Sequence, residues 1–292
     1  MILRLRHAVA AVVALCACFA STGFALENDP ALARLCIPNP VSPPPSSNNV
    51  MRPLWPCGES PVGDVSAYRS LAKEYGVALG PQLSSPAKTL GINGFQFDLQ
   101  FAITSINNTE TYWLNGVEDK TPESQLMVTR VGLRKGLAAS IELGSDVAYL
   151  VNSEMWTLGA FLKWSPHEMM ADFPVDLSFR GSLSKTVGSS QLELTMTGAD
   201  VVVGKTFGVG GVVSFSPYVG YSPLWVLARS GILDSTPGEA GTPGEFVFPE
   251  ETIMVQRFAF GIRSVTGLFS FTPEFVLADK QQTININLGL NF

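Results

Sequence analysis

A two-residue alternation of apolar and polar side chains runs through most of this chain and limits its fold more than any other feature. From Phe95 to Ile103, apolar residues alternate with Gln96, Asp98 and Gln100, so successive side chains point to opposite faces of a strand. The same period returns in further segments up to residues 282–292. About ten such segments follow position 90, which predicts an all-β, antiparallel architecture.

The first 25 residues have the three-part layout of a secretory signal peptide. Arg4 and Arg6 precede an apolar stretch, and small residues follow it. That stretch, about 13 residues, is too short to cross a membrane as a helix, and no later run of about 20 apolar residues exists. We predict that residues 1–25 are removed on secretion and that no transmembrane helix is present. A weaker alternative makes Cys18 a lipidation site.

The chain has 4 Cys, and Cys16 and Cys18 fall within the signal peptide. Cys36 and Cys57 are then the remaining thiols, in a compartment that oxidises them. We predict a disulfide between these two residues. The alternative is a pair of unrelated free thiols.

Residues 26–89 differ in character from the rest of the chain. Their prolines and a Ser/Asn cluster exclude a continuous strand or helix over much of the segment. Near its end, Asp64 can cap a short helix that stops at Gly76. The apolar face of that helix comprises Tyr68, Leu71, Ala72 and Tyr75. We predict that this segment is periplasmic. If the alternating strands close into a barrel, its helix either plugs the periplasmic mouth of that barrel or packs as a lid at its rim.

Alternation alone also fits a soluble β-sandwich, so the choice of a barrel rests on what the apolar face carries. Trp156 and Trp164 lie on one face, about 26 Å apart along the strand and roughly 20 Å along the membrane normal if the strand is tilted. This separation approaches the height of a lipid-facing band between two aromatic girdles. Only 15% of residues are charged, which also favours a lipid-facing surface. The predicted girdle comprises Trp156, Trp164, Tyr221 and Trp225.

The opposite face carries charges of both signs. In a narrow barrel such charges would pair and fill the interior, so we predict a largely occluded lumen. The predicted lumen-facing charged residues are Asp98, Arg130, Arg134, Glu142, Asp146, Lys163, Asp176, Arg180, Arg257, Arg263 and Glu274.

Several details fit the alternating pattern less well. The apolar parity changes beyond Gly198, which suggests a bulge. Pro217, Pro223 and Pro273 fall inside strands, where each removes a ladder hydrogen bond, so they are assigned to bulges or strand ends. The connections 107–124 and 233–251 are the longest and are predicted to be extracellular, whereas 165–172 is long for a periplasmic turn. These irregularities leave a range of about 8–12 strands.

With its signal peptide, amphipathic strands and aromatic last residue, the chain resembles Gram-negative outer-membrane β-barrel proteins over residues 90–292. In that family the barrel-assembly machinery recognises an alternating last strand that ends in an aromatic residue, and the last strand predicted here is similar to that signal. The matching residues here are Ile286, Leu288, Leu290 and Phe292. The resemblance implies a location in the cell outer membrane, with lipid and lipopolysaccharide as surroundings and Phe292 on the periplasmic side. It implies no activity.

Little in the sequence points to chemistry. A net charge of -6 gives no support to nucleic-acid binding. The chain has 2 His; His7 lies in the signal peptide, and His167 lies beside Glu168 in a predicted solvated turn. Proteolytic and lipid-modifying barrels use a His near acidic residues or a Ser, and neither pattern occurs at the expected rim. We therefore predict no enzyme, no metal site and no cofactor.

Two functional classes remain. A narrow or gated porin-like channel for small solutes is favoured slightly, because the lumen is charged and the N-terminal segment can act as a gate. The alternative is an adhesion or structural barrel that acts through extracellular loops, of which 235–251 is the most acidic.

Overall fold

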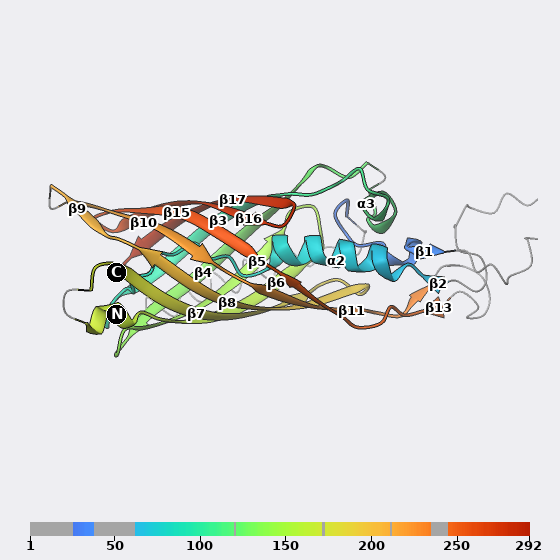
Figure 1. The fold of residues 1–292 in the computed structure, drawn as a ribbon. Helices are drawn as coiled ribbons and strands as arrows, with labels where there is room; N and C mark the ends of the chain where they lie inside the picture. The colour runs from blue at the N-terminus through green and yellow to red at the C-terminus, as the bar shows by residue number, and fades with distance from the viewer. Residues whose placement is uncertain (1–25, 38–61, 120, 171–172, 211, 235–244) are drawn as a thin grey trace, which may run out of the picture.

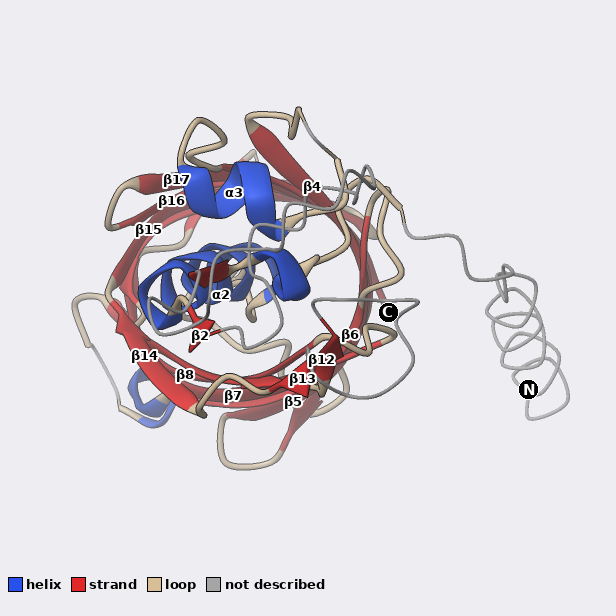
Figure 2. Ribbon diagram, turned by 90° about the vertical axis from the view of Figure 1, so that its right-hand side faces the viewer, coloured by secondary structure: helices blue, strands red, loops and turns tan. Residues whose placement is uncertain are grey.

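The computed structural model describes residues 26–37, 62–119, 121–170, 173–210, 212–234 and 245–292. They form a closed antiparallel barrel of 10 strands with a helix inside one end (Figures 1 and 2). The first strand pairs with the last, as in Phe101↔Ile286, so residues 282–292 close the barrel as predicted. No described helix is long and apolar enough to cross a membrane.

The wall strands follow one another in chain order, and two of them are interrupted once. They are β3 (Phe95–Ser105), β4 (Gln125–Leu137), β5 (Ile141–Leu150), β6 (Trp156–Trp164), β7 (Asp176–Val187), β8 (Leu192–Gly204), β10 (Val213–Tyr221) with β11 (Leu224–Ser230), β14 (Glu251–Val255) with β15 (Arg257–Thr266), β16 (Phe269–Ala278) and β17 (Gln281–Asn291). The smaller elements are η1 (Leu32–Arg34), β1 (Cys36–Ile37), β2 (Val62–Gly63), α2 (Val65–Leu79), α3 (Thr111–Gly116), η2 (Pro166–Met169), β9 (Phe207–Val209), β12 (Leu233–Asp234) and β13 (Glu245–Phe246).

The barrel has two distinct ends. At one end, called here the C-terminal rim, Phe292 pairs with Phe95 through two backbone hydrogen bonds of 2.8 and 3.0 Å. The other end, called here the helix rim, holds α2 (Figure 1). The described residues of the long connections 106–124 and 231–250 lie at the helix rim, as the alternation of loop lengths predicted.

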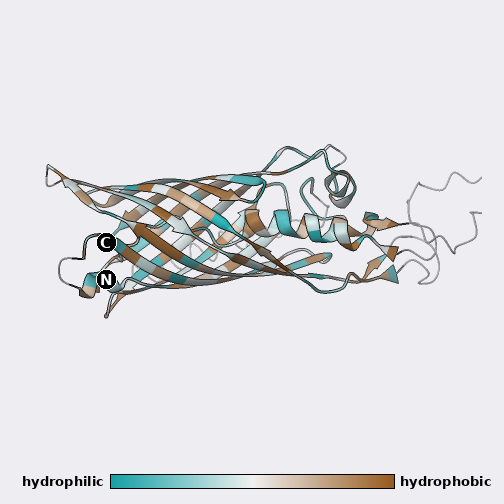
Figure 3. Ribbon diagram, in the orientation of Figure 1, coloured by the Kyte–Doolittle hydropathy of each residue, from teal (hydrophilic) through white to brown (hydrophobic). Residues whose placement is uncertain are grey.

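Alternation places apolar side chains outside and polar ones inside. On β17, Ile284, Ile286 and Leu288 are 54%, 40% and 44% exposed, whereas Asn285 and Asn287 are buried. Figure 3 shows the same banding along the strands. The wall thus presents an apolar outer surface, which suits lipid and not water.

The aromatic residues predicted for the girdle lie on this outer surface. Trp164 is 44% exposed and packs near Phe179, and Tyr221 and Trp225 are each 37% exposed. Trp156 is half-buried against Tyr149. Their role at a lipid interface stays a prediction.

Each in-strand proline coincides with a break in a ladder. Pro217 faces Lys205 and Thr206, where β8 ends and β9 has not yet begun. Pro223 separates β10 from β11, and Pro273 lies where the pairing of β15 with β16 lapses around Ile262. The missing proline amides therefore fall at local interruptions inside continuous wall strands.

The predicted bulge in β8 is wrong. β8 pairs with β7 without a break from Lys185↔Thr195 to Asp176↔Gly204. Leu192, Leu194 and Met196 point into the lumen and are at most 1% exposed, because α2 fills that part of the barrel. The same alternate residues of β8 point inward along the whole strand. They face α2 as far as Met196, and Asp200 then faces the charged residues of the lumen.

The predicted helix is present, and it is longer than expected. The side chain of Asp64 caps it by accepting a hydrogen bond from the Ala67 amide at 3.0 Å. Gly76 does not end the helix, which runs to Leu79. A Cβ at Gly76 would lie 2.6 Å from Val226 Cγ2, so this glycine serves close packing against the wall instead.

The described part of the N-terminal segment does not share an end with Phe292. Helix α2 lies inside the barrel at the helix rim, and residues 26–37 lie beyond it (Figure 1). The sequence analysis assigned both residues 26–89 and Phe292 to the periplasm, and these two assignments cannot both hold. The chain reaches β3 by crossing the lumen after α2.

The close contact at Gly76 gives a stability prediction. Gly76→Leu is expected to lower the free energy of unfolding by about 1–3 kcal/mol, because the added atoms meet Val226 in a closed barrel. Urea unfolding in detergent micelles would measure the loss. Ser66→Leu, at an exposed position of the same helix, is the control and should change the free energy little. Equal losses in the two variants would contradict the packing argument.

Candidate functional site

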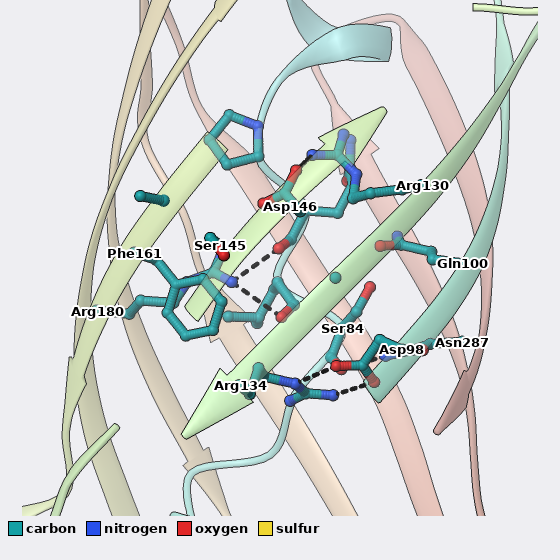
Figure 4. A pocket seen from close by; sticks show the side chains of 15 residues that line it. Ser84, Asp98, Gln100, Arg130, Arg134, Ser145, Asp146, Phe161, Arg180 and Asn287 are labelled. Carbon is teal, nitrogen blue, oxygen red and sulfur yellow. Dashed lines mark hydrogen bonds and ion pairs between the residues drawn. The ribbon is translucent and has the colours of Figure 1, made fainter. Parts of the chain in front are cut away.

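After α2 the chain continues as an extended segment, residues 80–90, called here the strap. It crosses the remaining lumen toward the C-terminal rim (Figures 1 and 4). Residues 80–87 are all buried. A buried extended chain cannot satisfy its own carbonyl and amide groups, so the wall has to supply partners.

Four basic side chains of the wall, on four different strands, donate to main-chain carbonyls of the strap and the last residue of α2. The bonds are Arg130 Nη2 to Leu79 O (3.2 Å) and Gly80 O (3.0 Å), Arg257 Nη1 to Pro81 O (3.0 Å), Arg180 Nη1 to Gln82 O (2.7 Å) and Leu83 O (3.0 Å), and Lys163 Nζ to Lys88 O (3.1 Å). Arg130 also places a positive charge at the C-terminus of α2, where the helix dipole favours one.

Carboxylates accept the strap's amides in the same way. Glu274 accepts from the Ser84 amide at 2.9 Å, and Glu142 accepts from the Leu90 amide at 3.0 Å. Glu168 of η2 accepts from the amide of Thr89. The wall charges are thus sorted by sign along the strap, with cations on carbonyls and carboxylates on amides.

Several of the same charges also form ion pairs across neighbouring strands. The pairs are Arg134–Asp98 (2.5 Å), Arg130–Asp146 (2.6 Å), Arg180–Asp200 (2.5 Å) and Lys163–Glu142 (3.0 Å). Arg257 and Glu274 have no ion-pair partner among the described residues. Ser222 and Pro81 oxygens hold Arg257, while Glu274 binds Tyr218, Asn285 and the strap.

The structure brings together nearly all of the charges predicted for the lumen. Nine are buried there: Asp98, Arg130, Arg134, Glu142, Lys163, Arg180, Arg257, Arg263 and Glu274. Asp146 is half-buried and pairs with Arg130 inside the barrel. Asp176 lies apart at the C-terminal rim, half-buried, with Thr206 Oγ1 donating to it at 2.9 Å.

Sequence reasoning missed Asp200 and the strap itself. Asp200 is 2% exposed and pairs with Arg180, and it was not among the charges predicted for the lumen. Its alternation with the outward-facing Val201 and Val203 would have identified it. The strap shows no periodic pattern, so only its two prolines mark it as an extended chain.

The strap leaves little free space beside it. A cavity of about 40 Å³ remains among Ser84, Gln100, Arg180 and Phe161 (Figure 4). That volume holds a few water molecules at most. The charged part of the lumen is therefore closed across its section by the protein's own chain.

The helix rim carries a cap, defined here as residues 26–37 together with α3. Glu74 of α2 is buried and accepts hydrogen bonds from Trp113 Nε1 at 2.6 Å, the Tyr112 hydroxyl at 2.8 Å and the Asn107 amide at 3.2 Å. The Tyr75 hydroxyl donates to Asn28 O at 2.8 Å. Helix α2 thus holds both parts of the cap.

Burial sets the ionisation of the phenols beneath the cap. Burial raises the pKa of Tyr75 well above its ordinary value, and the nearby Asp29 carboxylate adds to the rise. Burial also raises the pKa of Tyr68, with Glu251 and Glu250 contributing. Both phenols therefore stay neutral well into the alkaline range, and Tyr68 stacks on Phe248 at 4.5 Å.

Other predicted features lie outside this site or outside the described residues. His167 is buried and not solvated; its Nδ1 lies 3.0 Å from the Leu177 amide nitrogen and its Nε2 3.3 Å from Asp176. Cys57 and residues 1–25 are outside the described residues, so the disulfide with Cys36 and the signal peptide stay predictions. Within the described part, no group of three or more His, Cys, Asp or Glu could hold a metal.

No protein-family model and no curated protein sequence matches this chain. Among solved structures, it is similar to the N-terminal β-barrel domain of Pseudomonas aeruginosa OprF (11% identity, 69% of this chain, 99% of that chain, TM-score 0.29) and to the KdgM porin (9%, 68%, 99%, TM-score 0.33). A third is the translocator domain of the autotransporter NalP from Neisseria meningitidis (9%, 78%, 99%, TM-score 0.41). The closed antiparallel barrel has the architecture of outer-membrane β-barrel proteins.

The buried pair Arg180–Asp200 gives the site's stability prediction. Asp200→Ala is expected to lower the free energy of unfolding by about 3–5 kcal/mol, because Arg180 is left buried without its carboxylate. Glu193→Ala on the same strand breaks an exposed pair with Lys185 and should cost less than about 1 kcal/mol. Urea unfolding of both variants in micelles measures the difference. Losses of similar size would show that the lumen pair is not desolvated.

Proposed function

We propose that this protein is an outer-membrane barrel that its own strap seals to solutes, and that it acts as an anchor for the surface at its helix rim. The observation that carries the proposal is the continuous filling of the lumen by residues 65–90, first by α2 and then by the strap. Buried apolar contacts hold α2 against the wall, and buried hydrogen bonds hold the strap.

The orientation of the barrel follows from its loops. In single-chain bacterial barrels the periplasmic turns are short and the extracellular loops are longer. The turns at residues 138–140 and 267–268 lie at the C-terminal rim, whereas connections 106–124 and 231–250 lie at the helix rim. The helix rim then faces the outside, and its loops and cap form the surface available to partners.

A gated channel is the second candidate function. The observation in its favour is that most wall charges do not depend on the strap alone for their position, since eight of them form four ion pairs across neighbouring strands. Withdrawal of the strap would leave a lumen lined by charges of both signs. Such a lumen would suit small polar solutes.

Conductance in planar bilayers distinguishes the two candidates. The purified full chain is expected to give no channel events, because the free cavity in the charged half is about 40 Å³. A variant without residues 26–89, if it still migrates differently before and after boiling on a denaturing gel, is expected to conduct only if the channel candidate is right. Events from the full chain would refute the sealed barrel, and silence from both proteins would refute the channel.

The surface role can be tested on the loop at residues 235–244. Replacing it by a short turn is expected to lower the attachment of cells that carry the protein, while the barrel stays folded. The replacement should spare Phe248 and Glu251, because Phe248 stacks on Tyr68 and Glu251 pairs with Arg69 at 3.0 Å. Shortening the turn at 138–140 on the other rim is the control. Unchanged attachment after the loop replacement would count against the surface role.

A further inference from the structure

The chain enters the barrel wall from the end opposite to its N-terminal segment. The strap's last residues lie at the C-terminal rim, where Thr89 bonds to Glu168 and β3 begins at Phe95. Residues 26–37 lie at the helix rim, where the Asn28 amide donates to Asn152 O at 2.9 Å and the Ala31 amide donates to Gly116 O at 2.8 Å. The full length of the lumen separates these two parts of one chain.

Contacts at the helix rim make the N-terminal residues part of that surface. Asp29 is 7% exposed and accepts from the Ser153 hydroxyl and from the Glu154 amide, both at 2.7 Å. Arg34 pairs with Glu118 at 2.7 Å. Residues 26–37 are therefore bound to the loops between wall strands and do not merely lie over them.

We propose that this barrel carries its own N-terminal segment through its lumen to the outer face of the membrane, where residues 26–37 and the start of α2 become part of the surface. The inference rests on the proposed outward orientation of the helix rim. It assigns to the protein the transfer of a polypeptide, with its own chain as the substrate.

The charged half of the lumen has the properties that such a transfer needs. Its basic side chains bind carbonyls and its carboxylates bind amides, and every polypeptide offers both groups. The strap's side chains add few bonds: Lys163 Nζ donates to Ser85 Oγ at 2.9 Å, Asn285 Nδ2 donates to Gln82 Oε1 at 3.3 Å, and Thr89 Oγ1 donates to Glu168 at 2.7 Å. A site that recognises main-chain groups accepts an extended chain of almost any sequence.

The apolar half of the lumen, around α2, explains why the N-terminal segment stops at its observed position. Around α2 the wall is apolar, with Leu126, Leu150, Leu194 and Val226 each fully buried against the helix. Withdrawing α2 would expose these side chains to water, which is unfavourable. Helix α2 matches this half and has no counterpart in the charged half, so it fixes the final register of the segment.

Cysteine labelling on intact cells tests the proposal. Ser66→Cys places a thiol at the exposed start of α2, Ser190→Cys places one on a wall turn at the same rim, and Ala138→Cys places one on a turn at the C-terminal rim. The unsubstituted chain gives the background labelling. With a membrane-impermeant maleimide, we expect Ser66→Cys and Ser190→Cys to label in intact cells, and Ala138→Cys to label only after permeabilisation.

Each other outcome overturns a specific part of the argument. Protection of Ser66→Cys together with labelling of Ser190→Cys would refute the transfer and leave the sealed barrel standing. Labelling of Ala138→Cys alone would show the opposite orientation and refute both. Different gel migration before and after boiling confirms that each variant is folded.

Main-chain recognition has its own readout in the same assay. Adding Gln82→Ala and Ser85→Ala to the Ser66→Cys chain removes two of the strap's side-chain bonds and keeps the one from Thr89 to Glu168. Labelling in intact cells is expected to stay within about twofold, because the main-chain bonds remain. A tenfold drop in labelling, with the barrel still folded, would show that the lumen reads the strap's sequence and would refute a sequence-independent site.

Discussion

The rest of the structure depends on the hydrogen bonding of a main chain buried inside a closed barrel. An extended segment has no helical or sheet partners of its own, and each unsatisfied buried group would cost about 1–3 kcal/mol. The wall meets this requirement with charged side chains. Arg257 and Arg180 donate to the carbonyls of three consecutive strap residues, and Glu274 accepts from the amide of Ser84, which follows them. The dependence is mutual: Arg257 and Glu274 have no ion-pair partner among the described residues, and without the strap each would lose one of its hydrogen bonds.

The two halves of the lumen act together to place that segment. The apolar half determines where α2 lies, and the Arg130 contacts with Leu79 and Gly80 mark the border at which the helix ends and the charged half begins. Gly80 follows the helix and Pro81 cannot continue it, so the sequence changes conformation where the wall changes character. A shift of the segment toward either rim would put apolar helix residues among charges or strap carbonyls against leucines. The lumen therefore specifies one register, although most of its strap contacts are to main-chain atoms.

Local patterns predicted the elements of this fold better than their arrangement. The period of two identified the wall strands and the closing segment, and the Asp64 cap with its apolar spacing identified α2, because these signals lie within a few residues of one another. Whether an apolar strand face points to lipid or to an internal helix is not a local property. For that reason the inward residues Leu192 and Met196 suggested a false bulge. The end of the barrel at which α2 lies depends on the chain path, and no periodicity encodes it.

The charges predicted for the lumen show how one pattern can support different conclusions. Charges of both signs on inward positions indicate a narrow, occluded interior, and most of the predicted residues are buried inside the barrel. The expected reason, that the charges pair and fill the space themselves, accounts for only part of it. Arg134 with Asp98 fits that description, but Arg257 and Glu274 form no ion pair among the described residues, and each binds a main-chain atom of the strap. Inward charges in such a barrel can therefore indicate an internal segment as well as an aqueous pore.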